Sequence, residues 1–238
     1  MALPKVDTPI YELTLPSSKK KISYRPFLVK EQKLLLMAME DADGKSQAVV
    51  IQQVIRNCVL DEIDPKELPL YDIEYIFLQL RAKSIGEEVE LTYTCPCEDK
   101  NKIKFSVDLS DVKVNFDKRH TNKIKLNKDV GLTLKEPTID MLEDFDKLDN
   151  ENINIDDLIS IIIASLDTIY DKDTVYDPRE STREELEEFI SDLSQTQFEE
   201  FQMFFETLPK AYKDVKISCK KCDTTIEHRI EGMANFFG

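Results

Sequence analysis

The chain has 238 residues, of which 41% are hydrophobic, so it is long enough for one large domain or two small ones with a substantial core. Asp and Glu number 47 against 32 Lys and Arg, and the formal net charge of −15 disfavours a phosphate backbone as the general partner. Only five glycines occur, too scattered for a phosphate-binding loop, and no apolar run approaches the roughly 18–20 residues of a membrane span.

The first half of the chain is predicted to form a hairpin, three helices and a second hairpin. Apolar residues alternate on both sides of a lysine-rich turn, which is typical of a hairpin, and Pro26 ends this pattern. Apolar residues then recur at helical spacing, and Cys58 lies on one such stripe as a small core residue. The predicted elements are a hairpin at 10–25, helices at 29–41, 46–60 and 72–83, and a hairpin at 90–107.

The second half is predicted to contain another hairpin, four helices and a last hairpin. The segment from Asn154 to Tyr170 is apolar around most of its circumference, so it is expected to be buried or to form an interface. The run Ser181-Thr182-Arg183-Glu184 has the capping-box pattern of a helix start. The predicted elements are a hairpin at 124–134, helices at 138–148, 154–170, 181–193 and 196–208, and a hairpin at 215–230.

Four of the five cysteines form two pairs, each at a turn between strand-like runs. The pairs are Cys95-Pro96-Cys97 and Cys219-Lys220-Lys221-Cys222. The start of the chain lacks a signal-peptide pattern, so we expect a cytosol-like compartment, where thiols stay reduced and bind zinc in preference to forming disulfides. Four thiolates on one tetrahedral zinc form a closed, structural site. The alternative is four reduced, unrelated thiols. The predicted metal ligands are Cys95, Cys97, Cys219 and Cys222.

The remaining candidates for chemistry are few. His228 or His120 could replace a cysteine ligand, although both fit ordinary strand or surface positions. Adjacent acidic residues, such as Asp156 with Asp157, diverge along a helix and do not converge on a substrate. The sequence therefore predicts no enzyme.

Both halves show the same order of hairpin, proline, helices and cysteine knuckle, which suggests an internal duplication. The predicted repeats are residues 1–118 and 119–238, with one compact unit as the alternative. Each repeat would supply one knuckle, and the zinc would lie near a pseudo-twofold axis. The predicted fold is α+β, mainly helical with short β-hairpins, with a zinc ribbon formed by two distant cysteine knuckles.

The segment from Ser23 to Lys33, together with Tyr93-Thr94-Cys95-Pro96-Cys97 and Ile217-Ser218-Cys219-Lys220-Lys221-Cys222, resembles the baseplate hub subunit or hub assembly protein family of T4-like bacteriophages. The resemblance extends over nearly the whole chain. It implies a non-enzymatic protein that acts in assembly of the hub of a contractile tail's baseplate. It also implies other hub or tail proteins as partners, no membrane, and a place in the host cytoplasm during assembly or in the finished virion. The oligomeric state stays open.

Two alternatives come from other classes of protein. A zinc-ribbon regulator that contacts nucleic acid or a polymerase would use the lysines around the cysteine pairs, although the overall charge opposes this function. An enzyme with an unrecognised site is the weaker alternative. For protein partners, we expect the acidic loop at 61–70 or the apolar helix at 154–170 to provide the binding surface.

Overall fold

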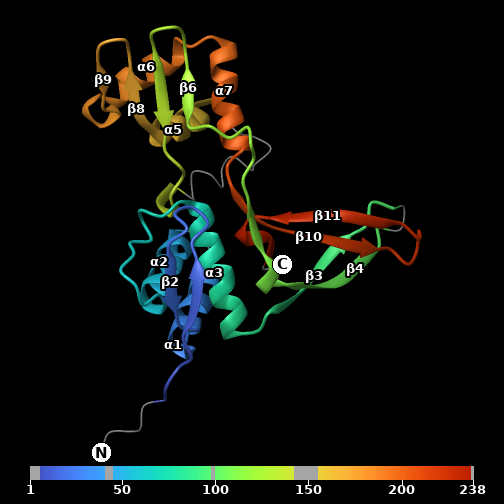
Figure 1. The fold of residues 1–238 in the computed structure, drawn as a ribbon. Helices are drawn as coiled ribbons and strands as arrows, with labels where there is room; N and C mark the ends of the chain where they lie inside the picture. Colours follow the sequence, from blue (N-terminus) through green and yellow to red (C-terminus); the bar gives the residue numbers. More distant parts are fainter. Residues whose placement is uncertain (1–5, 41–44, 98–99, 142–154, 237–238) are drawn as a thin grey trace, which may run out of the picture. The chain divides into compact units, whose positions relative to one another are not determined.

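The computed structural model describes residues 6–40, 45–97, 100–141 and 155–236 (Figure 1). The chain divides into two compact units: unit 1 contains residues 1–115 and 210–238, and unit 2 contains residues 116–209. Unit 2 is therefore an insertion into unit 1. At the point of insertion Asn115 and Lys210 pair in adjacent antiparallel strands, so the chain leaves and re-enters unit 1 at one place. The predicted duplication into repeats at 1–118 and 119–238 stays a prediction.

The N-terminal part of unit 1 is a β-hairpin with three helices. The hairpin tip is fixed to the third helix because the buried Asp72 accepts hydrogen bonds from the backbone and hydroxyl of Ser17. Proline 69 precedes that helix, where its fixed φ suits a helix start. The elements are β1 (Tyr11–Thr14), β2 (Lys21–Tyr24), α1 (Val29–Glu40), α2 (Lys45–Cys58) and α3 (Leu70–Ser84).

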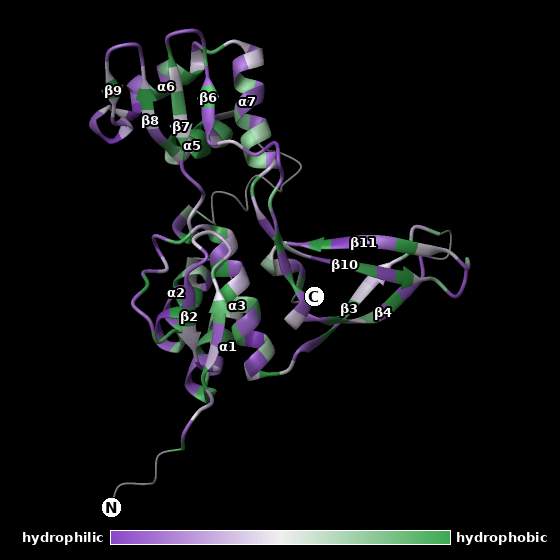
Figure 2. Ribbon diagram, viewed as in Figure 1, coloured by the Kyte–Doolittle hydropathy of each residue, from purple (hydrophilic) through white to green (hydrophobic). Residues whose placement is uncertain are grey.

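The rest of unit 1 consists of two long hairpins, one from each segment of the chain, which we call the cysteine ribbon. The first is β3 (Glu88–Thr94) with β4 (Lys102–Asp108), and the second is β10 (Lys210–Ser218) with β11 (Thr225–Glu231). In Figure 2, hydrophobic and hydrophilic residues alternate along β10 and β11, as expected for strands with one buried face. The other elements are β5 (Lys113–Asn115), which pairs with β10, and the 3₁₀ turns η1 (Leu109–Asp111) and η4 (Met233–Phe236).

Unit 2 is a four-stranded antiparallel sheet, in the order β6-β7-β8-β9, with helices that share its core. That core contains Leu132, Ile162, Phe201 and Phe204, all nearly inaccessible to solvent. Capping boxes at Thr182 and Ser194 begin the last two helices. The elements are β6 (Lys123–Lys125), β7 (Gly131–Leu134), η2 (Ile139–Met141), α5 (Ile155–Ser165), β8 (Leu166–Tyr170), β9 (Val175–Tyr176), η3 (Pro178–Glu180), α6 (Arg183–Ser191) and α7 (Gln195–Glu206).

The prediction of a mainly helical fold is wrong. Among the described residues, eleven strands in four sheets accompany the helices. One cause is that the predicted helix at 154–170 is half strand: α5 ends at Ser165, and Leu166–Tyr170 pairs with β7. The predicted helix at 138–148 begins as the turn η2, and its residues from 142 onward lie outside the described part of the chain. In the ranges that the structure describes, no helix combines the length and apolar character that crossing a bilayer requires.

Candidate metal centre

Each hairpin of the cysteine ribbon carries one predicted cysteine pair at its tip. Strand β3 ends one residue before Cys95, and β10 ends one residue before Cys219. The backbone N–H of Cys95 donates to the carbonyl of Asn101, and that of Cys219 donates to the carbonyl of Thr224, each at 2.9 Å. These bonds close each tip into a tight turn and fix the first cysteine of each pair.

Both turns contain a non-glycine residue in the left-handed region. Lys100 has φ 45° and Asp223 has φ 50°. Lys100 immediately precedes Asn101, and Asp223 immediately precedes Thr224, the two residues whose carbonyls close the turns. The two tips therefore reverse the chain with the same backbone conformation at the same position. This conformation is uncommon for residues with a Cβ, and Asp is among the residue types that adopt it more readily.

The four predicted ligands lie together although 124 sequence positions separate Cys95 from Cys219. Their Sγ atoms all lie within 4.8 Å of one another, and those of Cys95 and Cys222 are 3.8 Å apart. A tetrahedral zinc with Zn–S bonds of about 2.3 Å requires sulfur–sulfur distances of about 3.8 Å. Cys95 and Cys219 are buried, Cys97 is half-buried and Cys222 is exposed. The donor set and its spacing therefore fit one tetrahedral thiophilic ion.

Hydrogen bonds prepare Cys219 to act as a thiolate. The backbone N–H groups of Cys222 and Lys221 lower the pKa of Cys219 to about 6, and Asn101 assists with Nδ2 at 3.6 Å from the sulfur. At Cys95 the N–H of Cys97 also favours the thiolate, but burial and the neighbouring thiols outweigh it and raise the pKa. Thiols this close cannot all ionise without a cation, so metal binding would release protons.

The two hairpins meet because they share a core. Val89 and Leu91 of β3 belong to the same buried cluster as Ala211 of β10 and Ile230 of β11. Nearer the tips, the rings of Tyr93 and His228 pack with centroids 5.1 Å apart. Hydrophobic packing therefore holds the two hairpins side by side, and this arrangement brings the cysteines at their tips close together.

Neither histidine joins the thiol cluster, and His120 lies in an arrangement that the sequence analysis missed. In unit 2, its Nδ1 is 3.0 Å from Thr207 Oγ1 and its Nε2 is 3.1 Å from Glu136 Oε1. The Thr207 hydroxyl is buried and donates to the carbonyl of Met203 at 2.6 Å, so its proton is already used and it is not an available nucleophile. The three residues are separated in sequence and form no motif, so no local pattern predicts their contact.

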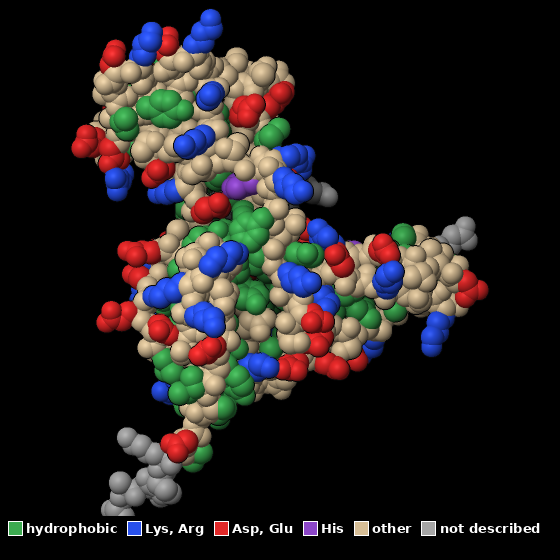
Figure 3. Space-filling model, in the orientation of Figure 1, with side chains coloured by type: hydrophobic (Ala, Val, Ile, Leu, Met, Phe, Trp, Pro, Cys, Tyr) green, Lys and Arg blue, Asp and Glu red, His purple; other side chains and the backbone are tan. Residues whose placement is uncertain are grey.

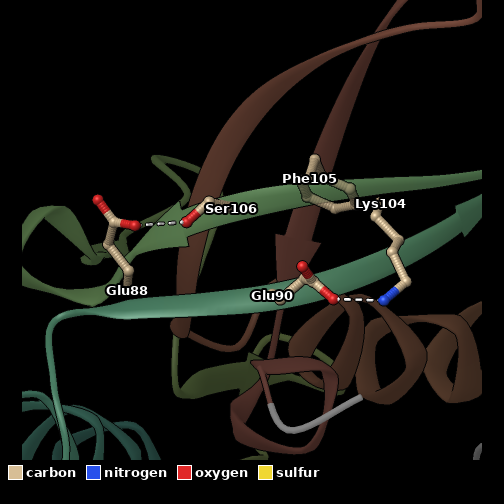
Figure 4. A pocket seen from close by; sticks show the side chains of 5 residues that line it. All are labelled: Glu88, Glu90, Lys104, Phe105 and Ser106. Carbon is tan, nitrogen blue, oxygen red and sulfur yellow. Dashed lines mark hydrogen bonds and ion pairs between the residues drawn. The ribbon is translucent and has the colours of Figure 1, made fainter.

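A shallow pocket on β3 and β4 offers no reactive group (Figure 4). Its polar lining is paired internally: Lys104 Nζ lies 2.6 Å from Glu90, and the Ser106 hydroxyl donates to Glu88 at 3.1 Å. Both pairs link β3 to β4, so we interpret them as cross-strand contacts that stabilise the hairpin.

The two surfaces suggested for partner binding each make some contacts within the protein. In the loop at 61–70, Asp61 accepts from the backbone N–H of Ser23, and Asp64 pairs with Arg56 at 2.7 Å. In α5, Ile161 and Ile162 are buried.

Comparison with known proteins places nearly the whole chain in one family model. The family model described as "T4 bacteriophage base plate protein" matches residues 8–238, which include all four clustered cysteines. No curated protein and no solved structure matches the chain.

Proposed function

This chain belongs to the family of T4 bacteriophage base plate proteins, and from that premise we propose that it is a non-enzymatic hub protein with a structural zinc ribbon. Family membership makes it a structural protein of the phage baseplate that interacts with other baseplate or tail proteins. The finer proposal is that it acts in assembly of the hub of a contractile tail by binding other hub or tail proteins. The family match over residues 8–238 is the observation that carries it.

The geometry of the thiol cluster supports a structural zinc. Four sulfur ligands would fill a tetrahedral zinc and leave no position for water or substrate. Bound zinc would cross-link the two hairpins, through Cys95 and Cys97 on one and Cys219 and Cys222 on the other. It would thereby join two segments of unit 1 that are separated in sequence by unit 2. This role suits a rigid assembly component.

The alternative of a regulator that binds nucleic acid has less support. Its basic face would need free lysines, but Lys104 pairs with Glu90 at 2.6 Å and Lys216 pairs with Glu227 at 2.9 Å. Carboxylates therefore offset part of the ribbon's positive charge. We expect no salt-dependent retention of nucleic acid in a filter-binding assay.

The proposed function can be tested with a nonsense mutation in this chain's gene. Infection in a non-suppressing host should yield tail intermediates without a complete hub, and the wild-type chain should restore it. Cofractionation of the tagged chain with hub proteins should accompany restoration. Tails of normal composition in the absence of the chain would contradict the hub role. Mass spectrometry of purified virions would then show whether the chain stays in the finished baseplate.

A further inference from the structure

The clustered thiols differ in their access to solvent. The first cysteines of the two tips, Cys95 and Cys219, are buried, whereas Cys222 is exposed. Cys222 lies in the turn between β10 and β11, where residues 220–225 are all exposed. Figure 3 shows basic and acidic side chains at the end of the ribbon where Figure 1 places this turn. A small polar solute can therefore reach Cys222 from the surface.

The exposed thiol of Cys222 also lies beside a thiol of the other hairpin. Its Sγ is 3.8 Å from the Sγ of Cys95, although 127 positions separate the two residues in sequence. A disulfide places its sulfur atoms about 2.05 Å apart, so a shift of less than about 2 Å would bring this pair to bonding distance. The fifth cysteine, Cys58, is buried and lies outside the cluster, so it provides an internal control.

We propose that the thiol cluster is a redox-convertible clamp, in which hydrogen peroxide oxidises Cys222 and a disulfide to Cys95 then replaces zinc as the link between the two hairpins. The proposal rests on the proposed function in one respect, that the reduced cluster binds zinc. Proteins of a virion pass from a reducing host cytoplasm to an oxidising exterior, where disulfides persist. The disulfide would keep the cysteine ribbon closed after this change of surroundings.

The conversion takes place in two balanced steps. The Cys222 thiolate attacks one oxygen of hydrogen peroxide, so an S–O bond forms, the O–O bond breaks and hydroxide leaves. The Cys95 thiolate then attacks the oxidised sulfur of Cys222, so the S–S bond forms, the S–O bond breaks and a second hydroxide leaves. The two sulfurs together lose two electrons, and the peroxide gains them. Two of the four ligands are thereby consumed, and Cys97 with Cys219 cannot form a closed four-sulfur site.

A disulfide between Cys219 and Cys222, within one tip, is the competing product. The sulfur of Cys219 accepts hydrogen bonds from two backbone N–H groups of its own turn and lies 3.6 Å from Nδ2 of Asn101. The sulfur of Cys95 accepts one backbone bond, from the N–H of Cys97. Hydrogen bonds to a thiolate are stronger than those to a neutral sulfur, so entry into a disulfide weakens them. Cys95 gives up fewer such bonds than Cys219, which favours the link between the hairpins.

Oxidation of the full-length, zinc-loaded protein tests the conversion. Hydrogen peroxide is added in the presence of a metallochromic zinc indicator, and the disulfides are then mapped by mass spectrometry of unreduced tryptic peptides. The tryptic peptides that contain the cluster are 84–100, 217–220 and 222–229. We expect one zinc to be released for each disulfide formed, and that disulfide to join peptide 222–229 to peptide 84–100. Fragmentation of the linked peptides before Pro96 should place the bond at Cys95.

The other products of oxidation would overturn the proposal. They are a disulfide between peptides 217–220 and 222–229, a bond at Cys97, zinc release without a disulfide, and retention of zinc. Dithiothreitol followed by added zinc should restore the starting state. Cys58 should stay reduced throughout, and its oxidation would show that unfolding, rather than the exposure of Cys222, governs the reaction.

Two serine variants test the assignment without bound metal. With peroxide, metal-free Cys97→Ser should still form the disulfide between the hairpins, whereas Cys95→Ser should not, and far-ultraviolet circular dichroism checks that both fold. In the metal-free wild type, amides of β11 should exchange about tenfold more slowly after oxidation than before it, because the cross-link restricts opening of the ribbon. Equal exchange rates would contradict a clamp.

The zinc site and its conversion fail separately. If wild-type protein purified under reducing conditions holds no zinc, the zinc site of the proposed function is refuted before any oxidation, and the conversion is refuted with it. If the protein holds zinc but peroxide produces no link between Cys95 and Cys222, the zinc site stands and only the conversion is refuted. The hub function is tested by the nonsense mutation and depends on neither result.

Discussion

Cys58 and Glu31 show how burial and bonding partners set the chemistry of single residues in unit 1. Burial raises the pKa of the Cys58 thiol to about 11, against the opposing charge of Arg25. The Arg25 guanidinium lies 3.7 Å from Cys58 Sγ and also 3.1 Å from Glu31 Oε1. Cys58 is therefore a core residue, as its position on an apolar stripe indicates, and Glu31 is the ion-pair partner of Arg25.

The buried thiol should be inert. In the native protein at pH 8, iodoacetamide should leave Cys58 unmodified, because the thiolate is the reactive form and little of it is present. Unfolding in urea should make Cys58 as reactive as an ordinary cysteine, as measured by mass spectrometry of tryptic peptides. Rapid alkylation of Cys58 in the folded protein would contradict this assignment.

Replacing Glu31 by Gln should destabilise unit 1 in a pH-dependent way. Burial alone would raise the pKa of Glu31, but hydrogen bonds from Arg25 and the Leu28 N–H, with the charges of Arg25 and Lys30, lower it below its usual value. The stabilisation is thus present above the unfolded pKa of about 4.5 and is lost as pH falls through the folded value. We expect Glu31→Gln to lower the free energy of unfolding by about 3 kcal/mol at pH 7, since it leaves the charge of the largely buried Arg25 without its carboxylate.

Urea unfolding at several pH values measures this effect. The difference in the free energy of unfolding between wild type and Glu31→Gln should decrease as the pH approaches 3. The control Lys30→Gln removes an exposed partner and should cost less than about 0.5 kcal/mol. A difference in the free energy of unfolding that stays constant with pH would show that the ionisation of Glu31 does not contribute to the stability of unit 1.

At the scale of elements, strand pairing explains where sequence periodicity misleads. The residues Leu166-Asp167-Thr168-Ile169-Tyr170 continue an apolar run that favours one long helix. In the structure they pair with β7, and the Thr133 and Thr168 hydroxyls lie 2.6 Å apart. β-branched and aromatic residues suit this paired surface, and the partner strand decides the outcome. The short strands β5 and β9 were missed because they depend on pairing with other strands.

Gly131 shows how closely β7 packs against its neighbours. A Cβ at this position would lie 2.6 Å from Tyr170 Cζ, with the tyrosine hydroxyl closer still, and 2.9 Å from the carbonyl of Ile124. Gly131→Ala should therefore destabilise unit 2 by about 1–3 kcal/mol through overpacking.

A double-mutant cycle separates this clash from other effects. Tyr170→Ala removes the nearest obstacle, so Gly131→Ala should cost less in that background, as measured by thermal unfolding. An undiminished cost in the Tyr170→Ala background would locate the strain elsewhere, at the carbonyl of Ile124.

At the scale of the whole molecule, the net charge is concentrated in the inserted unit. Unit 2 contains 24 of the 47 acidic and 10 of the 32 basic residues, which leaves 23 and 22 in unit 1. The net charges are therefore −14 and −1. Each unit also has a hydrophobic cluster of its own. The sequence did not reveal the insertion, because the pairing of Asn115 with Lys210 has no local signature. The thiol cluster was predictable, because paired cysteines at turns are a local pattern.

Two separate cores predict two unfolding transitions in calorimetry. Removal of metal with a chelator should lower the midpoint temperature of the unit 1 transition and leave that of unit 2 unchanged, because a ligand stabilises only the structure that binds it. Hydrogen exchange of β10 and β11 should assign that transition. One cooperative transition, or an equal shift of both, would contradict the independence of the two units.

The most direct test of the zinc clamp is the zinc content per chain of the native full-length protein, compared with Cys97→Ser, Cys222→Ser and the control Cys58→Ser. We predict one zinc in the wild type and in Cys58→Ser, and its loss in both of the other variants. Loss in both would establish that segments on either side of unit 2 share one ion. No zinc in the wild type, or loss in only one of the two variants, would contradict a metal site shared by Cys95, Cys97, Cys219 and Cys222.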